Sequence, residues 1–261
     1  MSMYGKWVFN SLTVRSKSKP SINRELMLPP YNVLITGSTK GIGYALAKEF
    51  LKAGDNVVIY PRSGEIVGTQ CDVREGQDVK DLVAFAQRNL GYIDIWYVRS
   101  NAYSYKPLAE ASDEDLIEVV ATNFLGLMIC CREAIKMMLN QPRGGGGGGG
   151  CGVGSAHILN IDGAGSDGRP TTRFAAYGAT KRSVVHLTKS LQAGLRMQDV
   201  KNVVVHNLSP GMVTTDLLMS EPAEVVANPS LPMDHEANLH PELLLVLEEA
   251  DMCLKIDWDE R

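Results

Sequence analysis

The stretch that decides the fold is NVLITGSTKGIGYALAKEFLKAG, residues 32–54. It begins with a short apolar run typical of a buried strand and continues with apolar residues at helical spacing up to Gly54. Gly37, Gly41 and Gly43 lie between the two. Glycines there let a backbone turn approach a pyrophosphate and seat the helix, whose N-terminus offers free N–H groups. The stretch therefore predicts a strand–turn–helix unit that binds a dinucleotide.

The rest of the chain repeats this alternation of strands and helices. Ser112 is a candidate N-cap of a long amphipathic helix, with Asp115 placed to complete a capping box. Alternating strands and helices predict an α/β fold, a doubly wound parallel sheet in a single Rossmann-like domain. Further strands are expected at 56–60, 66–73, 93–98, 156–161 and 202–209, and further helices at 78–91, 112–140 and 176–195.

Composition excludes several classes of function. A net charge of −4 over 261 residues gives no reason to expect a nucleic-acid partner. The histidines lack metal-ligand spacing, so no metal is assigned. The five cysteines are odd in number and form no C-x-x-C pair, which favours free thiols in a reducing compartment. No apolar run approaches the roughly 18 residues needed to span a bilayer.

Three segments flank or interrupt the expected domain, residues 31–220. Residues 1–30 form a basic leader, which is either transit-like or simply disordered. Residues 143–154 are a glycine-rich insertion, expected at the surface because ordering a glycine run costs much backbone entropy. Residues 221–261 hold 11 acidic and 2 basic side chains, so this divergent tail has a net charge of −9.

The second strand indicates which dinucleotide binds. A site for NAD places a carboxylate at the carboxyl end of that strand, where it contacts the ribose 2′-hydroxyl. Asp55 precedes the strand and lies at the wrong end. Arg62 follows the strand and Lys40 lies inside the glycine turn, so both cations could pair with a 2′-phosphate. The alternative for each is a solvated surface cation. Together they favour NADP(H) as the cofactor.

Tyr177 and Lys181 are the candidate acid/base pair. Residues i and i+4 of a helix share a face, and a neighbouring cation favours the phenolate form of a tyrosine. Such a tyrosine can donate a proton to a carbonyl oxygen while a nicotinamide supplies hydride. The spacing alone is weak, because it should occur by chance in about every second chain of this composition.

The motifs TGSTKGIG, YGATK and SPGMVTT, in this order, resemble the short-chain dehydrogenase/reductase family. The resemblance implies that Tyr177 is the acid/base, that Lys181 tunes it and binds the nicotinamide ribose, and that Asn123 of NFLG holds a water in a proton relay. It also implies that an Asp-Val pair contacts adenine. The implied cofactor-binding residues are Thr36, Gly37, Ser38, Lys40, Gly41, Ile42, Gly43, Arg62, Asp72, Val73, Tyr177, Lys181, Pro210, Gly211, Val213 and Thr215.

The serine that polarises the substrate in this family has no direct counterpart. Its usual position follows the strand before the active tyrosine, and here that position is Gly163. Ser166 is the nearest hydroxyl and is the candidate for the catalytic role from a shifted loop. An ordinary turn serine is the alternative.

Longer stretches, including residues 101–120 and 173–193, resemble the chlorophyll(ide) b reductases of plants. This narrower resemblance implies reduction of the 7-formyl group of chlorophyll(ide) b by NADPH, a chloroplast location at the thylakoid surface, and a homo-oligomer or a related reductase as partner. The alternatives are a catalytically impaired, partner-binding relative and a reductase of another carbonyl, such as a 3-oxoacyl or steroid substrate.

Three family features look absent, so the domain is expected to be truncated. Only residues 61–65 join the strands at 56–60 and 66–73, too few for a crossover helix. The stretch YVRSNAYS, residues 97–104, replaces the family's N-N-A-G. No substrate-covering segment or last strand is recognisable after Ser220. These changes affect the walls around the cofactor and the substrate.

Overall fold

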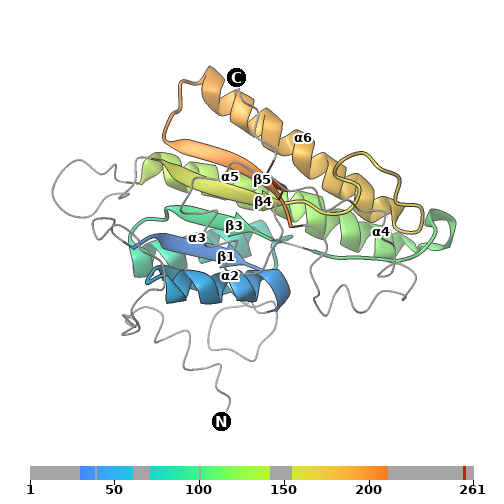
Figure 1. Cartoon of the computed structure of the whole chain (residues 1–261), viewed down its shortest axis with the longest axis horizontal. Coiled ribbons are helices and arrows are strands. Elements are labelled where there is room, and N and C mark those ends of the chain that lie inside the picture. The colour runs from blue at the N-terminus through green and yellow to red at the C-terminus, as the bar shows by residue number, and fades with distance from the viewer. Residues whose placement is uncertain are drawn as a thin grey trace, which may run out of the picture.

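The computed structural model describes residues 30–38, 40–60, 71–99, 101–141, 155–210 and 255–256. Its sheet has the strand order β2-β1-β3-β4-β5-β6 (Figure 1). Strands β1 to β5 are mutually parallel, and β6 pairs antiparallel with β5. The strands are β1 (Asn32–Thr36), β2 (Asn56–Tyr60), β3 (Ile95–Val98), β4 (Ala156–Ile161), β5 (Val203–Ser209) and β6 (Lys255–Ile256).

Helices cover both faces of this sheet, which confirms the predicted Rossmann-like architecture. One apolar core lies under α3, α5 and α6, and the other lies between α2 and the opposite face. Within β1, Leu34 belongs to the first core and Val33 and Ile35 to the second, because successive strand residues point to opposite faces. The helices are α2 (Gly41–Lys52), α3 (Gly76–Leu90), α4 (Asp113–Val120), α5 (Gly126–Asn140) and α6 (Ala175–Met197).

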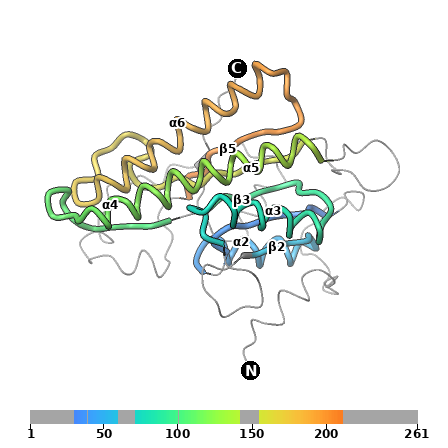
Figure 2. Tube along the Cα trace, turned by 180° about the vertical axis from the view of Figure 1, so that it is seen from behind, coloured from blue at the N-terminus to red at the C-terminus, as the bar shows by residue number. Residues whose placement is uncertain are grey.

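The predicted helix at 112–140 is α4 and α5 joined by a π-helical turn, η2 (Ala121–Leu125), after a short 3₁₀ turn, η1 (Leu108–Glu110). Ser112 caps α4, and its hydroxyl and the Asp115 carboxylate form the predicted capping box. Together, α4, η2 and α5 form one rod that lies along α6, as Figures 1 and 2 show from opposite sides. The rod carries Asn123 in its π-helical turn.

Two expectations change with the structure. The strand expected at 66–73 falls mostly outside the described residues, and its described part, Cys71 to Val73, is not in a strand. The acidic tail, in which no last strand was recognisable, contributes β6 to the sheet. The leader, the glycine-rich insertion and most of the tail lie outside the described residues.

The described part of the chain bears on two expectations, which concern the cysteines and membrane-spanning segments. Cys71, Cys130 and Cys131 are buried free thiols, and burial raises the pKa of Cys71 and of Cys131 to about 12. None of the helices in that part of the chain has the length and apolar character of a membrane span.

Candidate active site

The predicted glycine turn lies at the carboxyl edge of the sheet. Gly37 has a φ of +65°, a conformation that other residues rarely adopt. A Cβ on Gly43 would lie 2.5 Å from the Gly37 carbonyl oxygen, so α2 can press against the turn only because residue 43 is glycine. Thr36 fixes the end of β1, since its hydroxyl donates to the Tyr97 carbonyl at 3.2 Å.

The first turn of α2 is open to an anion. Lys40 is the N-cap residue in an extended conformation, its side chain makes no capping bond, and the first turn carries no acidic residue. Backbone N–H groups at such a helix start keep their donors for a ligand, and the helix dipole favours negative charge. Ser38 and Ile42 are buried beside the turn, and Lys40 is exposed. The arrangement fits the pyrophosphate of a dinucleotide.

The residues invoked for the 2′-phosphate are only partly described. Asp55 is 4% exposed and accepts a hydrogen bond from the Tyr31 backbone N–H, so it joins β1 to β2 at the amino edge, as expected. Arg62 lies outside the described residues. Arg99, which sequence reasoning did not select, follows β3 and donates its guanidinium N–H to the Lys40 carbonyl at 3.4 Å. Its backbone N–H donates to the Thr36 hydroxyl at 2.9 Å.

Some of the remaining cofactor candidates are described by the structure, and others are not. Asp72 is partly exposed, and its carboxylate accepts from the Arg74 guanidinium. Val73 packs on the start of α5, where a Cβ on Gly126 would come within 2.7 Å of its side chain. Pro210 is buried directly after β5. Gly211, Val213 and Thr215 lie outside the described residues.

Tyr177 and Lys181 lie together in the first two turns of α6. Their exposed fractions are 9% and 2%, and the Lys181 Nζ is 5.4 Å from the centroid of the Tyr177 ring. The ammonium donates to the Ile161 carbonyl at 3.3 Å. Burial lowers the pKa of Lys181 to about 8, against the opposing attraction of Asp162. The structure therefore places a buried cation beside the candidate acid.

Asn123 is fully buried in η2 and is held by a network of hydrogen bonds. Its side-chain oxygen accepts from the Ala102 N–H at 2.6 Å, and its amide nitrogen donates to the Ala102 carbonyl at 2.8 Å. The same nitrogen donates to the Thr180 hydroxyl at 3.3 Å, which in turn donates to the Tyr177 carbonyl at 2.6 Å. Asn123 thus connects the loop after β3 to the helix that carries Tyr177.

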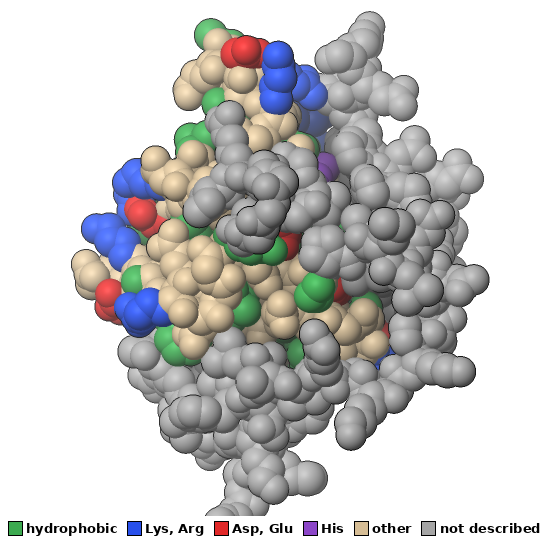
Figure 3. Space-filling model, turned by 90° about the vertical axis from the view of Figure 1, so that its left-hand side faces the viewer, with side chains coloured by type: hydrophobic (Ala, Val, Ile, Leu, Met, Phe, Trp, Pro, Cys, Tyr) green, Lys and Arg blue, Asp and Glu red, His purple; other side chains and the backbone are tan. Residues whose placement is uncertain are grey.

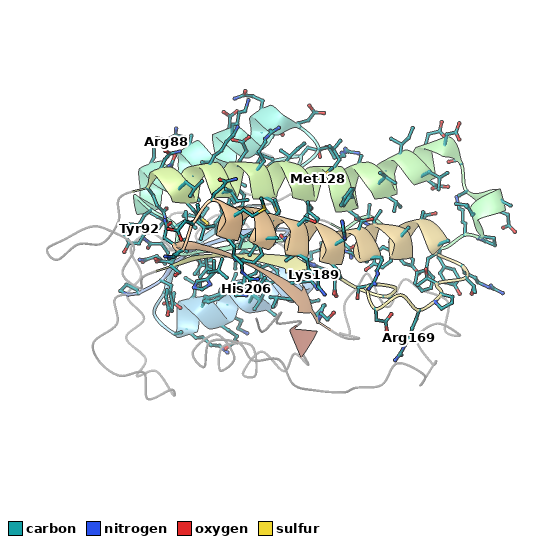
Figure 4. The ribbon with its side chains drawn as sticks, turned by 90° about the horizontal axis from the view of Figure 1, so that it is seen from above. Arg88, Tyr92, Met128, Arg169, Lys189 and His206 are labelled. Carbon is teal, nitrogen blue, oxygen red and sulfur yellow. The ribbon has the colours of Figure 1, made fainter. Side chains whose placement is uncertain are left out.

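Gly163 faces the Tyr177 hydroxyl. A Cβ on Gly163 would lie 2.4 Å from that oxygen, so the tyrosine fills the space that a side chain would need. The Ser166 hydroxyl is hydrogen-bonded to the Asp162 carboxylate, and the Ser166 backbone N–H donates to the Gly163 carbonyl at 3.0 Å. Figure 4 shows the loop between β4 and α6, with Arg169 labelled, beyond the carboxyl edge of the sheet. The polarising role of Ser166 stays a prediction.

Asp162 is a buried titratable group that sequence reasoning missed. It follows β4, is 5% exposed and accepts from the Asn207 amide at 2.7 Å and from the Ser209 hydroxyl. Burial raises the pKa of Asp162, while its hydrogen bonds and the Lys181 cation act in the opposite direction. Its place directly before the Gly163 position was the available signal.

Comparisons with known proteins agree on the family. Residues 31–225 match the family described as short chain dehydrogenase. Chlorophyll(ide) b reductase NOL of Arabidopsis thaliana is 66% identical over 83% of this chain and 68% of its own length. The NOL reductase of Oryza sativa subsp. japonica is 64% identical over 80% and 68%. A crystal structure of an actinorhodin polyketide ketoreductase variant with NADPH matches with a TM-score of 0.63, at 26% identity, over 77% of each chain.

Proposed function

The chain belongs to the short-chain dehydrogenase/reductase family, and from that premise we propose that it reduces the 7-formyl group of chlorophyll(ide) b to a hydroxymethyl group with NADPH. The family makes it an NAD(P)-dependent oxidoreductase. The pigment substrate rests on the names of relatives that are 64–66% identical. The reaction type rests on the buried Tyr177–Lys181 pair.

The observation that carries the proposal is the position of the Tyr177 hydroxyl. It lies over Gly163, in the loop after β4, and the Nζ of the buried Lys181 is 5.4 Å from the centroid of the Tyr177 ring. A buried cation favours negative charge on its neighbour, so Lys181 stabilises the phenolate that forms when Tyr177 gives up its proton. The pair therefore suits protonation of a carbonyl oxygen.

The reduction needs a proton and a hydride. NADPH, when bound, supplies the hydride that adds to the formyl carbon. Tyr177 donates its hydroxyl proton to the formyl oxygen, which becomes the hydroxyl of the product. Lys181 holds the positive charge that balances the phenolate, and Asn123 keeps the start of α6 fixed against the loop after β3.

The glycine turn is the group of residues that would hold the cofactor. Gly43 admits the close approach of α2, and the first turn of α2 offers N–H groups to the pyrophosphate. Lys40 and Arg62 would attract the 2′-phosphate, which NADPH carries and NADH lacks. Asp72 and Val73 would contact the adenine, and Pro210, Gly211, Val213 and Thr215 would line the nicotinamide and phosphates.

The direct test is product formation by purified protein incubated with NADPH and chlorophyllide b. We expect Tyr177→Phe to lower the rate of 7-hydroxymethyl product formation by about a hundredfold or more, because one general acid contributes that much. Tyr92→Phe, at the opposite edge of the sheet in Figure 4, is the matched control and should retain the rate. NADPH binding without any product from the native protein would favour a catalytically impaired relative instead.

We also propose a chloroplast location at the thylakoid surface and assembly with a second copy or with a related reductase. The chloroplast location is supported by the two reductases, both named chloroplastic. Assembly is supported by three exposed apolar side chains on the outer side of α4 and η2, which are Ile117, Val120 and Leu125. Replacing Ile117 by lysine should lower the mass measured by analytical ultracentrifugation; an unchanged mass would argue against this surface.

A further inference from the structure

Three aromatic side chains form a cluster that contacts Tyr177 through two of its rings, and no part of the proposed reaction uses them. Tyr103 and Tyr105 come from the loop after β3, and Phe174 immediately precedes α6. The Tyr103 ring centroid is 5.1 Å from that of Tyr177 and 5.6 Å from that of Phe174. Phe174 also lies 5.8 Å from Tyr105. We propose that these three rings, the aromatic wall, bind the flat face of the substrate's conjugated macrocycle.

The burial of the aromatic wall distinguishes it from the hydrophobic core. Tyr97 and Phe50, which belong to the core, are 1% exposed. Each ring of the aromatic wall is only half-buried, although each packs against another ring. Aromatic rings left partly open to solvent next to a reactive group are a suitable surface for a planar ligand, because stacking covers the remaining apolar area.

The rings of the aromatic wall are inclined to one another by smaller angles than the angle between Tyr103 and Tyr177. The Tyr103 and Tyr105 rings are inclined by 16° to each other, and Phe174 by 28° to Tyr105. The Tyr177 ring is inclined by 70° to that of Tyr103. The Phe174 ring is tilted by 42° from that of Tyr103, so the aromatic wall is not one flat plane. A macrocycle stacked on Tyr103 and Tyr105 would be steeply inclined to the Tyr177 ring. The formyl group of chlorophyll(ide) b is a rim substituent, which the proposed function requires to meet the Tyr177 hydroxyl.

The backbone beside each ring of the aromatic wall is held by a contact of its own. Ala102, next to Tyr103, exchanges two hydrogen bonds with Asn123. Lys106, next to Tyr105, forms an ion pair with Asp115 at 2.6 Å. The Phe174 carbonyl accepts from the Gly178 N–H at 3.0 Å at the start of α6. Rings fixed before binding lose little conformational entropy when a ligand stacks on them.

The inference rests on the proposed function for its ligand, so the test separates binding from reaction. The probe is chlorophyllide a, which has the macrocycle but a 7-methyl group in place of the formyl group. Its affinity for the full chain is measured by fluorescence quenching without NADPH. We expect Tyr105→Leu and Phe174→Leu each to weaken binding about three- to tenfold, the usual contribution of one aromatic stacking partner.

Two controls keep the test independent of folding. Tyr105→Phe keeps the ring and should bind chlorophyllide a like the native protein, and Tyr92→Leu removes a tyrosine at the opposite edge and should have no effect on binding. In turnover with chlorophyllide b, the two leucine variants should raise KM by the same factor and change kcat by less than about twofold. Leucine variants that bind the probe normally, or a native protein that does not bind it, would overturn the inference. If the leucine variants weaken chlorophyllide a binding as expected but the native protein forms no product from chlorophyllide b, the proposed function is wrong and the inference about binding stands.

Discussion

The two edges of the sheet both bury carboxylates, but they satisfy them with different partners. At the amino edge, Asp55 and Asp94 are 4% and 2% exposed and accept from the backbone N–H groups of Tyr31 and Asn32, at 2.9 and 2.8 Å. At the carboxyl edge, the hydrogen bonds described for Asp162 come from side chains. Asp55 and Asp94 join loops to β1, whereas Asp162 and its partners lie beside the candidate catalytic lysine.

The surroundings of the edges differ in the same sense. Figure 3 views the molecule from the amino edge, where basic and acidic side chains of the described residues lie beside one another in solvent. At the carboxyl edge the cation of Lys181 and the carboxylate of Asp162 are both buried. Burial lowers the pKa of Lys181 and raises that of Asp162, so it favours the neutral form of each group. Buried charge that costs stability is typical of a functional site, whereas carboxylates on backbone N–H groups stabilise the fold.

The largest effect is expected from Lys181→Met. Losing the cation beside Tyr177 should lower kcat about a hundredfold or more. The unfolding free energy should not fall, because a buried charge is replaced by an apolar side chain of similar length. Rate assays and urea unfolding measure the two quantities, with Lys189→Met, at an exposed position on the same helix, as the control. A clear loss of stability in Lys181→Met would show that the ammonium is structural.

The same variant has a pH signature. The pKa of Lys181 is about 8 in the folded chain against 10.5 when unperturbed, so between these values the unfolded chain binds more protons. Unfolding free energy should therefore rise with pH through this window, by on the order of 3 kcal/mol relative to Lys181→Met. Equal slopes in the native protein and the variant would contradict the burial of a charged lysine.

A smaller effect, on stability alone, is expected at the amino edge. Asp94→Ala leaves the buried Asn32 N–H without its carboxylate partner, so the unfolding free energy should fall by about 2–3 kcal/mol. The kcat of the folded protein should not change. Denaturant unfolding measures the loss, and Asp81→Ala on the exposed side of α3 is the control. A loss of kcat without a loss of stability would reverse the roles assigned to the two edges.

Gly163→Ser restores the hydroxyl that the resembled family carries, yet it should lower activity about tenfold. The new Cβ would lie 2.4 Å from the Tyr177 oxygen, so the tyrosine must shift from its place. Gly163→Ala carries the same Cβ without the hydroxyl and should lose a similar factor in kcat. A serine variant that is faster than the native protein would show that position 163 accepts the serine typical of the family.

The smallest effect is expected from Lys201→Ala. Lys201 pairs with Asp199 at 3.0 Å at the amino edge, where the side chains are 82% and 83% exposed. Solvent screens such a pair, and the entropy lost in ordering the long lysine side chain offsets the attraction. Neither the melting temperature nor kcat should change measurably. A reproducible fall in melting temperature would mean that this solvated edge contributes more to the fold than the contrast of the edges implies.

The secondary structure was predictable because its signals are local. The alternation of apolar strands with helical periodicity, together with the capping box at Ser112, predicts the elements that form the five parallel strands and their helices. The π-helical turn at Asn123 and the antiparallel β6 were not predicted. Both depend on contacts with distant parts of the chain, which periodicity does not report.

The sequence by itself determined the parallel α/β fold, the glycine turn and the Tyr177–Lys181 spacing, because each depends on residues close together in the chain. Only the tertiary structure decided the surroundings of that pair. It placed Gly163 against the tyrosine, buried Asp162 near Lys181, and brought Tyr103 and Phe174 to the same ring cluster. These groups come from separate loops that meet only because parallel strands end at a common edge.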